Sequence, residues 1–491
     1  MSATPDLRLV HLLPETRGHA LADTRIGDLV LDSRAVAAGD VFVAIKGEAR
    51  HGMEYAAQAR SNGAAVILSD EQFSVDADDV LLIEGLRDRL PEIACKRYGD
   101  PSLNMSVIGV TGTNGKTTTA QLLAQVLSSC QQCCGVIGTL GWGMPGALEP
   151  STHTTADVIS NQRMLAALRD AGASAVTMEV SSHALQQDRV AGVRFNTAVF
   201  TNLSRDHLDY HGSYEAYGNA KARLLSSIGL EHAVLNRDDL FCQSLGSRVP
   251  ANVSTTWYSV NNADADVRAQ SVRFGLDGIQ AFVETPWGAG ELHLPLIGGF
   301  NLPNALAVLS AACLQGIAFD AALAVLAAVK PVPGRMERVA TDAGAPLIII
   351  DYAHTPDALD QALSAVREHV LGRVWCVFGC GGDRDSGKRP LMGRLAHERS
   401  DVVIVTSDNP RSENPLSIIA DICAGIPTGD EQRIVDRAEA IDYAVRSAKA
   451  GDAVLIAGKG HEDYQEINGQ RLPFSDLECV RTALLRRGAA A

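Results

Sequence analysis

The sequence predicts an α/β protein built from three domains. Its length of 491 residues suggests about three domains of ordinary size. Short apolar runs typical of buried strands alternate with segments of helical periodicity over most of the chain. Two stretches, residues 99–104 and 331–336, have the composition of linkers. We therefore expect an N-terminal domain over residues 1–103, a central domain over 104–333 and a C-terminal domain over 334–491.

The first hundred residues alternate short strands with helices. Residues 29–34, 39–47 and 64–68 predict strands, and residues 51–63 predict a helix. Ser33 stands near the end of the first strand, where its hydroxyl could contact a diphosphate or the edge of a uracil base. A solvated strand end is the other interpretation, and the chemistry of this residue alone favours it.

A glycine-rich turn in the central domain predicts a site for nucleotide phosphates. It has the sequence GTNGKT over residues 112–117, between a buried strand and a helix. Glycines let successive backbone N–H groups turn toward an anion, and a helix N-terminus adds a favourable dipole. In this pattern Lys116 reaches the outer phosphates and the Thr117 hydroxyl ligates Mg²⁺. The strict Walker spacing is not met, because Val110 stands where the first glycine belongs.

Polar residues follow two further strands of the central domain. Glu179 lies at the end of the strand over residues 175–180, and His207 follows the strand over 197–203. Ligands lie outside the carboxyl ends of strands in an open α/β sheet, and a carboxylate there suits Mg²⁺. Histidine is a less usual magnesium ligand, so a hydrogen-bonded histidine is an equal interpretation of His207.

Two other features of the central domain have simpler interpretations. Residues 253–296 shift to alternating polarity, which predicts antiparallel strands beside the parallel sheet. Lys221 stands in a helical segment, where side-chain chemistry alone indicates an ordinary solvated lysine.

Four apolar runs in the last part of the chain predict a small Rossmann-like domain. Polar loops after these runs carry Arg384, Asp408 and Arg411, and two arginines suit recognition of a carboxylate. Paired surface charges are the other interpretation of these loops. The glycines over residues 379–382 lack the spacing of a dinucleotide fingerprint, so we do not expect NAD. The runs are residues 347–352, 374–379, 402–406 and 453–457.

Composition limits the classes of partner and the compartment. Acidic residues outnumber basic ones, 58 to 43, and the net charge of −15 argues against a general nucleic-acid binder. The ten cysteines follow neither zinc nor disulfide-scaffold spacing, and the start of the chain lacks the apolar core of a signal peptide. No apolar run approaches the length of a membrane span. We expect a cytoplasmic protein, without membrane insertion, that binds small molecules and is a monomer.

Motifs along the whole chain resemble those of the Mur ligase family, the ATP-dependent amino-acid-adding enzymes of peptidoglycan synthesis. The resemblance is greatest to the family's meso-diaminopimelate-adding branch. The motifs are GTNGKT over residues 112–117, EVSSH over 179–183, DHLD over 206–209, Lys221, GFNLPN over 299–304, GRME over 334–337, DYAHTPD over 351–357, GDRD over 382–385 and DNPR over 408–411.

The resemblance implies roles for individual residues. The catalytic group is Lys116, Glu179, His207 and Lys221. The ATP-binding group is Gly112, Thr113, Asn114, Gly115, Lys116, Thr117, Thr118, Asn301, Asn304, Arg335 and Asp351. The metal ligands are Thr117, Glu179, His207 and Lys221, with Lys221 carbamylated so that its charge becomes that of a carboxylate. The UDP-substrate group is Leu31, Ser33, His153, Thr154, Thr155, Ser181, Gln187 and Arg189. The diaminopimelate group is Arg384, Asp408, Asn409, Pro410, Arg411, Gly458 and Glu462.

The family implies an activity as well as a site. Mg²⁺-ATP would phosphorylate the γ-carboxylate of UDP-N-acetylmuramoyl-L-alanyl-D-glutamate, and the amine of meso-diaminopimelate would attack the acyl phosphate. Arg411 would select diaminopimelate, since lysine lacks the second carboxylate. His153 and His51 depart from the family pattern, which has asparagine and aspartate there. A lysine-adding Mur ligase, a folylpolyglutamate synthase and a nucleotide-binding scaffold without catalysis are the alternatives.

Overall fold

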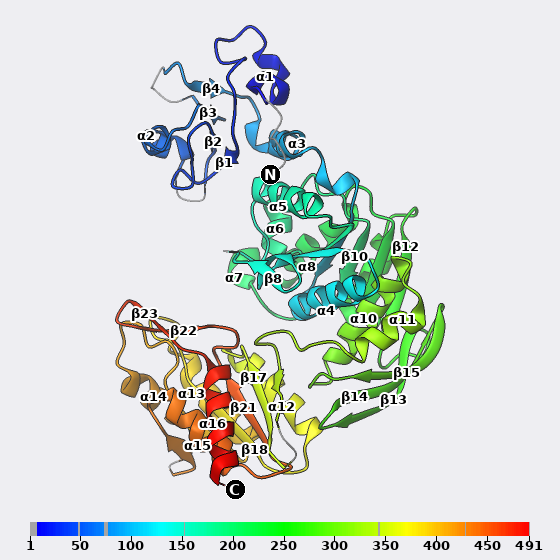
Figure 1. The fold of residues 1–491 in the computed structure, drawn as a ribbon, viewed down its shortest axis with the longest axis vertical. Helices are drawn as coiled ribbons and strands as arrows, with labels where there is room; N and C mark the ends of the chain where they lie inside the picture. The colour runs from blue at the N-terminus through cyan, green and yellow to red at the C-terminus, as the bar shows by residue number, and fades with distance from the viewer. Residues whose placement is uncertain are drawn as a thin grey trace. The chain divides into compact units, whose positions relative to one another are not determined.

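The computed structural model describes residues 7–47, 50–72, 77–151, 153–341, 344–427 and 429–490 (Figure 1). The chain divides into two compact units. Unit 1 comprises Met1–Lys116, Gln131–Val234 and Ser244–Thr255, and unit 2 comprises Thr117–Cys130, Leu235–Gln243 and Thr256–Ala491. The predicted α/β class is confirmed in both units, whereas the bounds of the three predicted domains stay predictions. Among the described residues no helix is long and apolar enough to cross a membrane.

The N-terminal part of unit 1 is a four-stranded parallel sheet in the order β1-β2-β3-β4. All four residues of β2, with the sequence VFVA, are buried, as expected for a strand covered on both faces. Separate apolar clusters form on the two sides of this sheet. The strands are β1 (Leu29–Val30), β2 (Val41–Ala44), β3 (Val66–Ser69) and β4 (Val80–Leu82), and the helices are α1 (Leu9–Leu12), α2 (Ala56–Ser61) and α3 (Leu86–Tyr98).

The rest of unit 1 carries a sheet in the order β11-β10-β5-β9-β6-β7-β8. Strands β10, β5, β9 and β6 are parallel, so the chain segments after β5, β9 and β10 leave the same edge. The strands are β5 (Ser106–Thr111), β6 (Cys134–Gly138), β7 (Gly141–Met144), β8 (Ala147–Glu149), β9 (Ala175–Glu179), β10 (Thr197–Phe200) and β11 (His232–Asn236). The helices are α5 (Val158–Asp170), α6 (Ser182–Gln186), α7 (Leu208–His211) and α8 (Tyr214–Ala222).

Unit 2 begins with α4 (Lys116–Ser129), whose first residue belongs to unit 1. The alternating segment forms β13, β14 and β15 as an antiparallel meander, which confirms the predicted pattern there. Strand β12 pairs parallel to β13, so the prediction was wrong for that strand. The elements are α9 (Leu240–Leu245), β12 (Ser254–Ser259), β13 (Val267–Gly275), β14 (Gly278–Thr285), β15 (Gly288–Leu294), α10 (Asn301–Leu314) and α11 (Phe319–Leu326).

The C-terminal part of unit 2 is a six-stranded sheet in the order β16-β17-β21-β18-β19-β20, antiparallel only at β16. Apolar residues of α12, α13 and α14 cover one face, and those of α15 and α16 cover the other, which confirms the Rossmann-like prediction. The strands of this sheet are β16 (Glu337–Val339), β17 (Leu347–Asp351), β18 (Val374–Phe378), β19 (Val402–Val405), β20 (Glu431–Arg433) and β21 (Ala453–Ala457). Strands β22 (Tyr464–Ile467) and β23 (Gln470–Pro473) pair antiparallel as a separate two-stranded sheet. The helices are α12 (Pro356–His369), α13 (Lys388–Arg399), α14 (Pro415–Cys423), α15 (Arg437–Ser447) and α16 (Asp476–Ala490).

Candidate active site

The first residue of the glycine-rich loop after β5 has a backbone conformation and surroundings that only glycine can adopt. Gly112 has a φ of +151°, and a Cβ placed there would lie 1.9 Å from Thr201 Oγ1. The loop is tied to the segment after β10, because the Thr113 and Asn114 N–H groups donate to the backbone and side-chain oxygens of Asn202 at 2.9 Å each. These two hydrogen bonds therefore fix the loop against the segment after β10.

Two lysine ammonium groups meet at this loop. Lys116 Nζ donates to the carbonyl oxygens of Gly112 at 2.9 Å and Thr113 at 2.8 Å, and Lys221 Nζ donates to the Gly112 oxygen at 2.8 Å. Lys221 is 1% exposed and lies 4.5 Å from the centre of the Tyr217 ring. The interpretation of Lys221 as a solvated helix lysine was wrong, because α8 turns this side chain inward. Thr117 and Thr118 follow Lys116 in the first turn of α4, which belongs to unit 2.

Glu179 is fully buried at the end of β9. Its carboxylate accepts from the Thr139 N–H at 2.9 Å and from the Thr139 hydroxyl at 3.2 Å. The Thr139 hydroxyl also lies 3.0 Å from the Thr154 hydroxyl. The residues alone gave no signal for Thr139, because its role depends on β6 lying beside β9.

His207 lies in a cluster of aromatic side chains after β10. Its ring centre is 4.8 Å from that of His183, and its Nε2 lies 3.3 Å from an Asp206 carboxylate oxygen. His207 has a φ of +51°, so the backbone here adopts the left-handed conformation. Burial lowers the pKa of His183, with the neighbouring His207 as a second cause. His183 was quoted in a family motif but received no role, and its contact with His207 depends on the fold.

The predicted magnesium site fits these residues only in part. Within the described ranges, no three His, Cys, Asp or Glu side chains form a group that could hold a metal ion. An unmodified Lys221 ammonium would repel a cation, whereas a carbamate on this nitrogen would supply oxygen ligands of the kind Mg²⁺ prefers. The fit therefore depends on the chemical state of Lys221.

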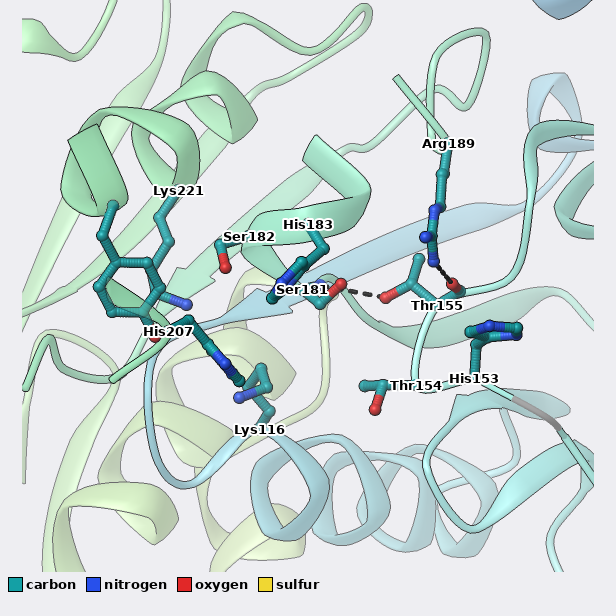
Figure 2. Close-up of a pocket in the computed structure, with 11 residues that line it drawn as sticks. Lys116, His153, Thr154, Thr155, Ser181, Ser182, His183, Arg189, His207 and Lys221 are labelled. Carbon is teal, nitrogen blue, oxygen red and sulfur yellow. Dashed lines mark hydrogen bonds between the residues drawn. The ribbon is translucent and has the colours of Figure 1, made fainter. Parts of the chain in front are cut away.

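A cavity of about 300 Å³ is lined by Lys116 of the glycine-rich loop and by residues predicted to bind the UDP-substrate (Figure 2). The Thr155 hydroxyl donates to the Glu179 carbonyl at 2.8 Å and accepts from the Ser181 N–H at 3.0 Å. Arg189 Nη1 donates to the Thr155 carbonyl at 3.2 Å. The lining residues are Lys116, His153, Thr154, Thr155, Ser181, Ser182, His183, Arg189, His207, Tyr217 and Lys221. Five residues predicted for the UDP-substrate thus share one cavity with three of the predicted catalytic residues.

A second cavity of about 800 Å³ in unit 1 is lined by Leu31, Gln187 and Arg189, again from the UDP-substrate group. Ser33 lines neither of these two cavities; it is buried, and its hydroxyl donates to Gln58 Oε1 at 2.8 Å. His51, which departs from the family pattern, is also buried. Its Nε2 lies 2.8 Å from Asp70 Oδ1 and its Nδ1 accepts from the Met53 N–H, so it organises its own loop.

The remaining residues predicted to bind ATP lie in unit 2. Asp351 Oδ2 accepts from the Met336 N–H at 2.7 Å and Oδ1 from the Ala353 N–H at 2.8 Å, while burial raises the pKa of this carboxyl. Asp351 thereby fixes the turn that carries Arg335. The Arg335 guanidinium lies 5.2 Å from the centre of the Tyr352 ring. Asn301 and Asn304 are buried at the start of α10, where Asn304 Nδ2 donates to Asn301 Oδ1 at 3.3 Å.

The residues predicted for diaminopimelate meet where loops leave β18, β19 and β21. Arg411 Nη1 donates to the Gly382 carbonyl at 2.8 Å, and its Nε lies 3.6 Å from Glu466 Oε2. A Cβ added to Gly381 would contact both arginines, at 2.8 Å from Arg411 Nη1 and 3.9 Å from Arg384 Cγ. The two predicted carboxylate-binding side chains therefore border the same small space.

Asp408 lies against Gly458, and Asn409 contacts Glu462. A Cβ on Gly458 would lie 2.4 Å from Asp408 Oδ2, and its φ is +118°. Asn409 Nδ2 donates to Glu462 Oε2 at 2.8 Å, which joins the loops after β19 and β21. Pro410 lies between Asn409 and Arg411 and is buried.

The chain belongs to the Mur ligase family. Residues 25–98 match the Mur ligase family catalytic domain, residues 110–312 the Mur ligase middle domain, and residues 334–460 the Mur ligase glutamate ligase domain. A UDP-N-acetylmuramoyl-L-alanyl-D-glutamate–2,6-diaminopimelate ligase of Alkalilimnicola ehrlichii is 49% identical over 475 residues, covering 94% of this chain and 95% of its own. The Pseudomonas aeruginosa ligase of the same name is 47% identical, covering 94% of this chain and 96% of its own.

Solved structures agree with this assignment. A UDP-N-acetylmuramoyl-L-alanyl-D-glutamate–2,6-diaminopimelate ligase superposes with a TM-score of 0.75 at 38% identity, over 98% of this chain and 99% of that one. A folylpolyglutamate synthase of Mycobacterium tuberculosis, complexed with ADP and AMPPCP, gives a TM-score of 0.61 at 20% identity. It covers 75% of this chain and 92% of its own, and at this identity it shows a shared fold alone.

Proposed function

We propose that the protein is an ATP-dependent amide ligase that adds meso-diaminopimelate to UDP-N-acetylmuramoyl-L-alanyl-D-glutamate in peptidoglycan precursor synthesis. The observation that carries the proposal is the cavity that Lys116 and Lys221 share with residues predicted to bind the UDP-substrate. Near full-length relatives whose names state this reaction support the choice of substrates.

The proposed reaction has two steps. The γ-carboxylate of the D-glutamate residue attacks the γ-phosphorus of ATP, which forms an acyl phosphate and releases ADP. An amine of diaminopimelate then attacks the acyl carbon, an amide forms, and inorganic phosphate leaves with the C–O bond electrons. Lys116 would exchange its two carbonyl partners for phosphate oxygens, and Arg189 and Thr155 would orient the glutamate end of the substrate.

Mg²⁺ is the cofactor we propose, with Thr117, Glu179, His207 and carbamylated Lys221 as the residues that would hold it. When bound, it supplies positive charge beside the phosphates. The burial of Lys221 supports carbamylation, because a buried ammonium beside Lys116 is electrostatically unfavourable and the carbamate removes that repulsion.

We assign recognition of the amino-acid substrate, diaminopimelate, to residues of unit 2. Arg384 and Arg411 would bind the carboxylate that distinguishes diaminopimelate from lysine, and Glu462 with Asp408 would bind an ammonium group. The substrates are small molecules, and we place the reaction in the cytoplasm with a monomeric enzyme. A lysine-adding enzyme remains the alternative within the family, and Arg411 argues against it.

The experiment that tests this function measures phosphate release from Mg²⁺-ATP with each substrate omitted in turn. We expect release only when the UDP-substrate and meso-diaminopimelate are both present, and little release when L-lysine replaces diaminopimelate. Equal use of lysine would contradict the assignment of Arg411. Release without the UDP-substrate would indicate a plain nucleotide hydrolase, and release with a folate and L-glutamate in place of the two substrates would indicate a folylpolyglutamate synthase.

A further inference from the structure

Lys459 is a fully buried lysine for which the proposed reaction has no role. It follows Gly458 in the loop after β21, and its exposed fraction is 0%. Burying an ammonium group costs free energy unless charged or polar partners surround it. Such a residue in a loop that carries two predicted substrate contacts needs an explanation.

The partners of Lys459 are themselves residues of the amino-acid site. Its Nζ donates to Glu462 Oε2 at 3.0 Å and to Asn409 Oδ1 at 3.0 Å. Its ammonium also lies 5.5 Å from the centre of the Tyr464 ring. One buried cation thus joins the loop after β19, which carries Asn409, to the loop after β21, which carries Glu462.

Removing the charge of Lys459 would affect these two partners differently. Asn409 Oδ1 also accepts from the Glu466 N–H at 3.0 Å, so it would keep a hydrogen bond. Glu462 would keep the neutral Asn409 amide at 2.8 Å but lose its ion pair. Removing the charge of Lys459 would therefore affect mainly the Glu462 carboxylate, which would lose its ion pair.

The arrangement also decides which oxygen of Glu462 can meet a substrate. Asn409 and Lys459 both bind Oε2, which leaves Oε1 for an incoming ammonium group. The Glu462 side chain is 19% exposed, whereas that of Lys459 is 0% exposed, so Glu462 is the member of this pair that solvent reaches.

We propose that Lys459 is a positioning residue for the amino-acid substrate and acts through Glu462. It fixes one carboxylate oxygen so that the other faces the ammonium group of diaminopimelate. This inference rests on the proposed function, because it takes diaminopimelate as the substrate of this site.

The test is a double-mutant cycle in the full-length enzyme with Lys459→Met, Glu462→Gln and the double variant. Lys449→Met, an exposed lysine of the same domain, is the matched control. Phosphate release gives kcat and the KM for each of the three substrates, and thermal unfolding reports folding. We expect Lys459→Met to raise the KM for diaminopimelate by about 10- to 100-fold. The KM for ATP and for the UDP-substrate should change less than about twofold, since neither Lys459 nor Glu462 is among the residues predicted to bind them.

In the double variant the two effects should not multiply, because both act on one interaction. We expect its KM for diaminopimelate to stay within about threefold of the worse single variant. A product of the two single effects, or an equal rise in all three KM values, would overturn the inference. Lys459→Gln keeps a hydrogen-bond donor without the charge and replaces Lys459→Met in the same cycle if the methionine variant does not fold. Wild-type enzyme with no diaminopimelate-dependent release would instead overturn the proposed function.

Discussion

Replacing Arg411 with alanine should remove most of the preference for diaminopimelate over lysine. A hydrogen-bonded pair between a guanidinium and a carboxylate contributes about 1.5–3 kcal/mol. The Arg411 side chain is 22% exposed and its Nε lies 3.6 Å from Glu466 Oε2, so part of its charge is already neutralised. Reducing the contribution for these two effects leaves about 1–2 kcal/mol, which corresponds to roughly 5- to 30-fold in kcat/KM.

The assay compares kcat/KM for meso-diaminopimelate and L-lysine by phosphate release at saturating ATP and UDP-substrate. Arg411→Ala should lower the value for diaminopimelate by that factor and leave the value for lysine equal or higher. Arg394→Ala removes an exposed arginine of the same domain, 59% exposed, and should change neither value. An Arg411→Ala enzyme that still discriminates as strongly as wild type would refute this explanation of selectivity.

Three further predictions follow from the buried and close-packed positions. Lys221→Ala should lower the rate of phosphate release by at least about 100-fold. Short carboxylates such as formate should restore part of this rate, because they replace the carbamate oxygens. Loss of activity without any rescue would contradict carbamylation. Gly458→Ala should lower the free energy of unfolding by about 1–3 kcal/mol, measured by denaturant unfolding. The reason is that Gly458 has a φ of +118° and that an added Cβ would meet Asp408. Unchanged stability would contradict the described conformation of this loop. Iodoacetamide at pH 8 should label Cys133 before Cys134, as measured by peptide mapping. Cys133 is exposed, whereas burial raises the pKa of Cys134 to about 12. Equal labelling of the two cysteines would contradict the described burial of Cys134.

Local patterns were sufficient to predict the fold class and the phosphate loop. The apolar strand before Gly112 and the periodic helix after it are encoded within 25 residues, and the structure has both. The six-stranded C-terminal sheet follows similarly from apolar runs separated by helices. These features depend on neighbours along the chain, which the sequence displays directly.

Features that depend on distant neighbours could not be predicted in this way. Lys221 was interpreted as solvated, because nothing local shows that α8 points it at the Gly112 carbonyl more than 100 residues away. Thr139 holds Glu179 only because β6 and β9 are adjacent, and β12 pairs parallel where local alternation indicated an antiparallel strand. The chemistry of strand ends suggested Glu179 and His207 as metal ligands, whereas Lys221 received that role only from family resemblance, and all three roles stay predictions.

We expect the D-glutamate γ-carboxylate to be phosphorylated before the amide forms. Isotope transfer tests it most directly, with ¹⁸O placed in both oxygens of that carboxylate and the released phosphate analysed by mass spectrometry. The acyl-phosphate mechanism predicts one ¹⁸O atom in each phosphate formed with meso-diaminopimelate, and one ¹⁸O retained in the amide product. Phosphate without ¹⁸O, released in step with the amide, would show that the carboxylate oxygen never joined phosphorus and would contradict the mechanism.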